Sequence, residues 1–188
     1  MGKPNITSLL NQWHLGDPNA LNQVVSLVHD ELHRIARGRL AAWDHRISLV
    51  DPTVLVHETY LRLVGYRPRE EKAWSHKGEF FSLVATMMLH ILMDYQKRKR
   101  AKKHGGANIK VTLEDDMGTG RSEWDLMALE EVLAQLERLD ARQGKIWKCR
   151  YLCGLSIDEL VQAFALSPAT LHREIKAANG WIHYRLGV

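Results

Sequence analysis

Hydrophobic positions recur at helical spacing along almost the whole chain, and the alternation typical of strands is nearly absent. After Asp17-Pro18, apolar residues return every three or four positions from Leu21 to Ala36, which predicts one amphipathic helix. Asp51-Pro52 opens a second helical pattern, and a third is predicted from about Gly78 to Arg100. The pattern predicts an all-α fold.

Residues 102–123 interrupt this pattern with four glycines, a basic start and an acidic middle, which is typical of a flexible linker. Helical spacing then resumes over about 126–136 and 141–153, followed by two short helices in 155–176. We therefore expect two small helical domains, 1–101 and 124–188. Neither is large enough to enclose a sizeable substrate pocket comfortably, so an enzyme is not expected.

The segment LSIDELVQAFALSPATLHREIK (155–176) has the form of a helix-turn-helix. Ser156 and Glu159 form a capping-box pattern, and Ser167-Pro168 starts the second helix. If this helix reads DNA, its N-terminal half presents candidate contacts, namely Ser167, Thr170, His172, Arg173 and Lys176. The segment alone is equally compatible with two ordinary packed helices.

The net charge of +4 is concentrated in residues 1–100, which carry 14 Lys/Arg against 10 Asp/Glu. The run KRKRAKK (97–103) suits a phosphate-binding surface, and it also suits a solvated helix end. Aromatic residues and cations stand together at both ends of the predicted helix, with Trp74 and Lys77 before it and Tyr95 beside the basic run at its end. Rings and cations together favour single-stranded nucleic acid, although Phe80 and Phe81 read better as core.

Catalytic signatures are weak. His29 and His33 could share a helix face as two zinc ligands, but Asp30 stands where such hydrolases carry Glu, and no third ligand is apparent. Cys149 and Cys153 read as buried thiols in a reducing cytoplasm. The sequence has no phosphate-cradling glycine loop, secretory signal or transmembrane run. We expect no cofactor, no metal and no membrane association.

Three segments in order carry a family resemblance: DPTVLVHETYLRLV (51–64), HKGEFFSLVATMMLHILMDYQKRKRAKKHGG (76–106) and the helix-turn-helix segment. Together they resemble a bacterial RNA polymerase sigma factor of the extracytoplasmic-function (ECF) type, within the sigma-70 family. The resemblance covers about Ile6 to Leu186. It implies a cytoplasmic protein whose partners are core RNA polymerase (β′ clamp and β flap), promoter DNA and an anti-sigma factor.

The resemblance also implies residue roles. Core polymerase would be bound by Val54, His57, Glu58 and Leu61. The minus-10 element would be melted and read by Trp74, Lys77, Asp94, Tyr95, Lys97, Arg98 and Arg100. The minus-35 element would be read as duplex by the five helix-turn-helix residues named above.

Several positions depart from the family pattern. Val161 stands where a small residue is usual, and Ala165 occupies a turn position where glycine is usual. Because alanine adopts a left-handed turn only at some cost, this turn is expected to be strained. Asn179 replaces a common Arg, and residues 167–179 sum to only +1, which predicts weak autonomous minus-35 binding. Tethering to polymerase would offset that weakness.

Three other functions remain open from the sequence. One is a free-standing helix-turn-helix regulator that binds duplex DNA without polymerase, although the near-neutral C-terminal domain argues against it. Another is a degenerate sigma-like protein that binds a partner but no promoter. The third is a zinc hydrolase using His29 and His33.

Overall fold

Most helices begin at a residue whose side chain caps the free backbone N–H groups. The computed structural model describes residues 5–42, 51–66, 73–102, 110–114 and 121–187. Asp17, Asp51 and Ser167 each accept a backbone hydrogen bond and each precede a first-turn proline, as the sequence indicated. The capping box of Ser156 and Glu159 is also present.

The described residues form the following elements in chain order: α1 (Ile6–His14), α2 (Pro18–Leu27), α3 (His29–Ala42), α4 (Pro52–Gly65), α5 (Lys77–Lys102), β1 (Lys110–Glu114), β2 (Arg121–Asp125), α6 (Leu126–Leu139), α7 (Ala141–Trp147), the π-helix η2 (Lys148–Leu152), α8 (Ile157–Phe164) and α9 (Pro168–Leu186). The predicted all-α class is confirmed. The long helix expected over 78–100 is α5.

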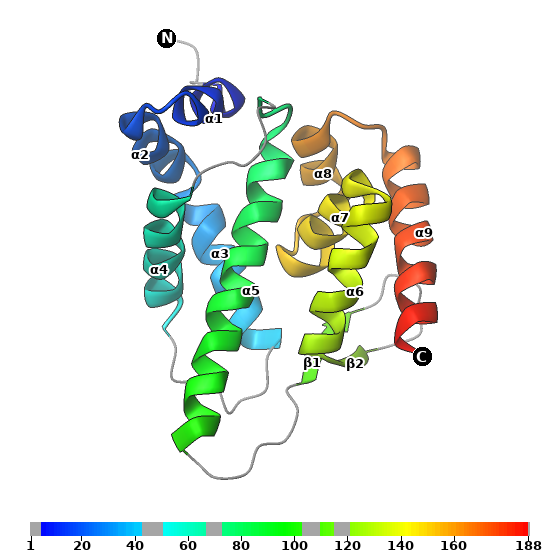
Figure 1. Cartoon of the computed structure of the whole chain (residues 1–188). Coiled ribbons are helices and arrows are strands. Elements are labelled where there is room, and N and C mark those ends of the chain that lie inside the picture. The colour runs from blue at the N-terminus through cyan, green and yellow to red at the C-terminus, as the bar shows by residue number, and fades with distance from the viewer. Residues whose placement is uncertain (1–4, 43–50, 67–72, 103–109, 115–120, 188) are drawn as a thin grey trace.

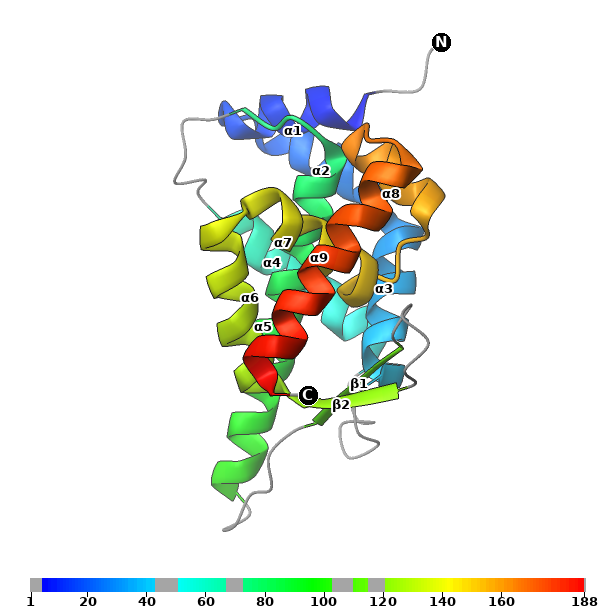
Figure 2. The same ribbon diagram turned by 90° about the vertical axis from the view of Figure 1, so that its right-hand side faces the viewer.

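Helix α5 is the central element of the molecule. Helices α1–α4 lie on one side of it and α6–α9 on the other (Figure 1). Turning the molecule by 90° brings α9 to the front, next to α7 and α8 (Figure 2). One continuous apolar cluster joins both sides, from Leu10 in α1 through Met88 in α5 to Ile182 in α9.

The structure departs from the predicted elements in several places. The single helix expected over 21–36 is two helices, because the chain leaves helical geometry at Val28 (φ −109°, ψ 14°). The helix expected over 141–153 ends as the π-helix η2, where Cys153 N–H donates to Lys148 O five residues back (3.0 Å). Helix α1 was not predicted.

The segment expected to be a linker contains secondary structure. Strands β1 and β2 pair antiparallel, with Lys110 opposite Asp125 and Glu114 opposite Arg121. Apolar Val111 and Leu113 alternate with polar neighbours in β1, a signal too short to stand out in the sequence. The hairpin lies close to α6, which follows it directly.

Candidate functional site

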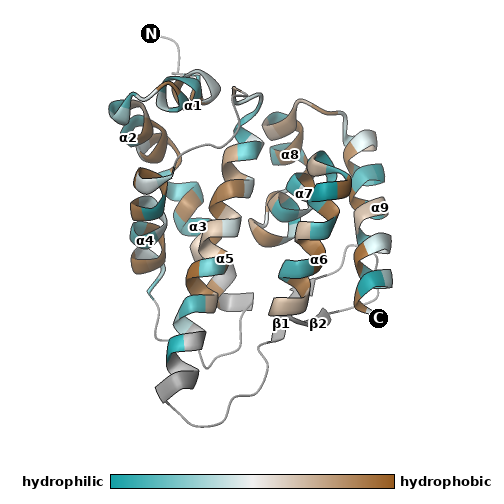
Figure 3. Cartoon of the chain, viewed as in Figure 1, coloured by the Kyte–Doolittle hydropathy of each residue, from teal (hydrophilic) through white to brown (hydrophobic). Residues whose placement is uncertain are grey.

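Helix α4 exposes an apolar stripe on the face that points away from the core. Val54 is 44% exposed, Leu61 54% and Val64 48%, while Leu55 and Leu63 on the opposite face are buried. Apolar residues of α4 therefore lie on two faces, one packed and one open. Figure 3 shows apolar and polar positions alternating along this helix. A helix of a globular protein normally buries its apolar side, so the open stripe is a candidate docking surface.

The predicted polymerase-binding residues lie along this open side of α4. Val54, His57 and Leu61 are exposed, and Glu58 is partly exposed. Val64 extends the stripe by about one further turn and was not among the predicted residues. The three-residue step from Leu61 to Val64 was the signal that could have placed both on one face.

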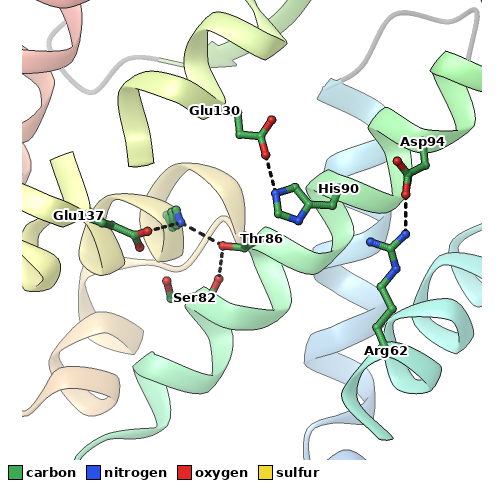
Figure 4. Close-up of polar contacts among 8 residues, drawn as sticks. Arg62, Ser82, Thr86, His90, Asp94, Glu130 and Glu137 are labelled. Carbon is green, nitrogen blue, oxygen red and sulfur yellow. Dashed lines mark hydrogen bonds and ion pairs between the residues drawn. The ribbon is translucent and has the colours of Figure 1, made fainter. Parts of the chain in front are cut away.

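Two polar contacts connect α4 to α5. The Tyr95 hydroxyl donates to Glu58 Oε1 (2.5 Å). Arg62 Nη2 lies 2.7 Å from Asp94 Oδ2 (Figure 4). The hydrogen bond to Glu58, with some burial, raises the pKa of Tyr95. The predicted minus-10 residues Asp94 and Tyr95 are thus brought against the predicted docking helix.

The other predicted minus-10 residues lie elsewhere on α5. Lys77 begins the helix, 17 residues before Asp94, which corresponds to about 25 Å along the axis. Arg98 is exposed near the far end. Lys97 and Arg100 belong to the same last turns of α5, but their side chains lie outside the described residues. The predicted set therefore divides between the two ends of one helix.

Trp74 is packed against α1. Its ring stacks on Trp13 with centroids 5.9 Å apart, and it meets Phe80 edge-on. The Asn11 side chain binds the backbone of Trp74 twice, accepting from its N–H (2.7 Å) and donating to its carbonyl (3.2 Å). This packing fixes the segment that leads into α5, and the minus-10 role of Trp74 stays a prediction.

Helices α8 and α9 are separated by residues 165–167, and the N-terminal half of α9 carries the predicted minus-35 residues. Ser167 Oγ accepts from Thr170 N–H (3.2 Å) and lies 2.9 Å from Thr170 Oγ1. His172 donates Nδ1–H to the Pro168 carbonyl (2.7 Å). Arg173 and Lys176 are exposed, and no ion pair engages either of them within the described part of the chain.

Two polar residues of α9 face inward. Glu174 is buried and pairs with Arg142 of α7 (2.6 Å). Asn179 is also buried, accepting from Trp147 Nε1–H (2.8 Å) and donating to the Tyr151 hydroxyl (2.6 Å). The outward face of α9 is therefore more cationic than the sum over 167–179 indicates. Asn179 is therefore a core residue.

The residues considered for metal chemistry do not assemble a site in the described part of the chain. The His29 and His33 rings lie 4.5 Å apart, and no group of three or more His, Cys, Asp or Glu side chains there could hold a metal ion. Cys149 and Cys153 are buried thiols, and burial raises the pKa of Cys149 well above its usual value. None of the described helices is long and apolar enough to cross a membrane.

The family described as "ECF sigma factor" matches residues 3–188, nearly the whole chain. The chain belongs to the ECF sigma factor family. Members of this family bind core RNA polymerase and promoter DNA, and the family is not a class of enzymes. No protein with a curated description matches the sequence. Among solved structures, the chain is similar to CnrH in complex with the cytosolic domain of CnrY, at 15% identity, 96% coverage of both chains and a TM-score of 0.40.

Proposed function

We propose that this chain acts in the cytoplasm as a promoter-specificity subunit that docks on core RNA polymerase through α4 and directs transcription initiation. The observation that carries the docking assignment is the open stripe of Val54, Leu61 and Val64. Exposed apolar residues at helical spacing are typical of a protein–protein interface. In this proposal His57 and Glu58 supply the polar contacts beside the stripe.

Two further surfaces would read the promoter. Asp94, Tyr95 and the basic end of α5 would contact the melted minus-10 element, because aromatic and cationic groups suit single strands. The exposed face of α9, with Arg173 and Lys176, would enter the major groove at the minus-35 element. Glu174 points inward to Arg142, so the turn of α9 that carries Arg173 places no acidic side chain against the DNA phosphates. This direction supports the assignment of α9 to the minus-35 element.

The docking surface is tested by Leu61→Asp, measured as binding of the full chain to core polymerase. Because a charge on a central interface residue opposes desolvation, we expect at least a ten-fold loss of affinity. Leu139→Asp is the matched control, since Leu139 is 71% exposed on α6. Equal binding by both variants would contradict the docking assignment.

Glu58→Lys requires its own control, because the substitution also removes the acceptor of the Tyr95 hydroxyl. Tyr95→Phe breaks the same hydrogen bond and keeps Glu58. If Glu58 contacts polymerase, Glu58→Lys weakens binding to core polymerase more than Tyr95→Phe does. If the two variants bind equally, the effect comes from the contact between α4 and α5.

Promoter reading is tested by run-off transcription with core polymerase. Arg173→Ala should reduce discrimination at the minus-35 element by about 1–3 kcal/mol if Arg173 contacts a base edge. Arg185→Ala removes an exposed arginine from the other end of α9, where Arg185 contacts Gln135, and should leave discrimination unchanged. Absence of both core binding and promoter-dependent transcript in the wild type would refute the proposed function.

A further inference from the structure

The N-terminal half of α9 has one buried face and one exposed face. Leu171, Glu174 and Ile175 are buried. The exposed residues recur at three- and four-residue spacing, so they share the outward face; they are Ala169, His172, Arg173 and Lys176. Helix α9 runs across the front of the molecule in Figure 2. In the proposed function this outward face enters the major groove.

His172 is held against the first turn of α9. Its Nδ1 lies 2.7 Å from the carbonyl oxygen of Pro168, four residues earlier. A carbonyl oxygen can only accept, so Nδ1 carries the hydrogen of this bond. The contact directs the ring toward the N-terminus of the helix, which is the end of a recognition helix that approaches base edges. The ring of His172 is therefore oriented and has a defined tautomer.

The other ring nitrogen of His172 has the opposite character. In a neutral imidazole only one nitrogen carries a hydrogen, so Nε2 presents a lone pair and accepts hydrogen bonds. The side chain is exposed, and no residue in the described part of the chain binds Nε2. His172 thus offers a hydrogen-bond acceptor to whatever lies against this face of α9.

The neighbours of His172 offer a different chemistry. Arg173 and Lys176 have donors and no acceptor. The Ser167 and Thr170 hydroxyl groups lie 2.9 Å apart, and Ser167 Oγ also accepts from the Thr170 N–H (3.2 Å), so both hydroxyls are engaged in capping the helix. Nε2 of His172 is therefore an acceptor placed among donors.

The edges of the bases in the major groove differ in which groups donate and which accept. Guanine presents the acceptors N7 and O6, and thymine presents the acceptor O4. Cytosine and adenine present the amino groups N4 and N6, which donate. An acceptor on the protein complements an amino group and is repelled by O6 or O4. The tautomer of His172 consequently distinguishes two classes of base.

We propose that His172 is a specificity-determining residue, whose Nε2 accepts a hydrogen bond from the exocyclic amino group of a cytosine or an adenine in the minus-35 element. The proposal rests on the proposed function and adds the chemical group that this residue reads. One hydrogen bond between neutral groups corresponds to about a five-fold change in affinity.

The tautomer is tested in the free full-length chain by nitrogen-15 NMR at about pH 8.5, where imidazole side chains are neutral. The ring signals that are absent from His172→Ala identify His172. We expect a protonated Nδ1 and an unprotonated Nε2, because the Pro168 carbonyl binds the Nδ1 hydrogen. An unprotonated Nδ1 would overturn the proposal.

The preferred base is tested by run-off transcription with core polymerase from promoters randomised over the minus-35 element. At one position the wild type should prefer cytosine or adenine about five-fold, and His172→Ala should lose that preference. His172→Lys has only donors and should prefer guanine or thymine there. His183→Ala is the matched control, since it removes a histidine from the other half of α9. An unchanged preference in His172→Ala would contradict the assignment.

The hydrogen bond itself is tested by methylating the amino group of the preferred base. N4-methylcytosine and N6-methyladenine keep one amino hydrogen for base pairing and place a methyl group where the other hydrogen faces the major groove. This change should reduce transcription by the wild type about five-fold and leave transcription by His172→Ala unchanged. An equal reduction for both proteins would show that His172 does not accept from this group.

The outcomes separate this proposal from the proposed function. Promoter-dependent transcription with base preferences that His172→Ala does not alter would overturn the role of His172 and leave the sigma function intact. Absence of promoter-dependent transcript from every template would refute the sigma function. The NMR measurement needs neither polymerase nor DNA, so it would still decide the tautomer.

Discussion

Ala165 ends α8 in a left-handed conformation, with φ 54° and ψ 40°. Among the described residues it is the only one other than glycine with a positive φ. Its N–H donates to the Val161 carbonyl (2.9 Å), which closes the last turn of α8. The turn between α8 and α9 thus contains the strain that the sequence predicted, and replacing Ala165 by glycine should remove it.

The expected gain in stability is the difference of two effects. A left-handed backbone costs a residue with a Cβ about 1–2 kcal/mol. Glycine increases the conformational entropy of the unfolded chain, which costs about 0.4–1 kcal/mol. The Ala165 methyl group is exposed, so its loss removes no packing. Ala165→Gly should therefore raise the free energy of unfolding by about 1 kcal/mol, and Tm by about 2–4 °C.

Thermal unfolding followed by circular dichroism measures this shift, and Gly154→Ala provides a control of opposite sign. Gly154 has φ 66° and open space around an added Cβ, so the substitution adds backbone strain without a steric clash. We expect Gly154→Ala to lower Tm by a similar amount. A lower or unchanged Tm for Ala165→Gly, beside a lower Tm for Gly154→Ala, would refute the assignment of strain to Ala165.

Three other substitutions address buried and partly buried polar groups that join helices. Asn179→Ala leaves Trp147 Nε1–H without its acceptor and should lower the free energy of unfolding in urea by about 2 kcal/mol. Lys148→Met should lower it by about 2 kcal/mol, because it removes the ammonium group that contacts Glu137 of α6 and Thr86 of α5. Burial raises the pKa of the Glu79 carboxyl group. The hydrogen bond from the Ser75 N–H and the neighbouring Lys145 ammonium group lower it by more, so the pKa lies below its usual value of 4.5. The stability that ionised Glu79 contributes is therefore present above pH 4.5 and is lost as the pH falls through the depressed pKa. Glu79→Gln has no such group, so its free energy of unfolding should fall less than that of the wild type between pH 5 and pH 3.

Local signals in the sequence were sufficient for the helix starts and for the strained turn. Asp51-Pro52 and Ser167-Pro168 act within one helical turn, so neighbouring residues alone determine the outcome. The left-handed geometry of Ala165 was expected from the family resemblance, because glycine is usual at this turn position. The interruption at Val28 gave no comparable signal, because the apolar spacing continues unchanged through it.

Residues with distant partners could not be placed from the sequence. Glu174 and Asn179 look like surface positions of α9, and only their contacts with Arg142 and Trp147 show that they face inward. The contact of Tyr95 with Glu58 joins two surfaces that the family resemblance assigned to different partners. Each contact connects positions more than 30 residues apart, so no local pattern encodes it.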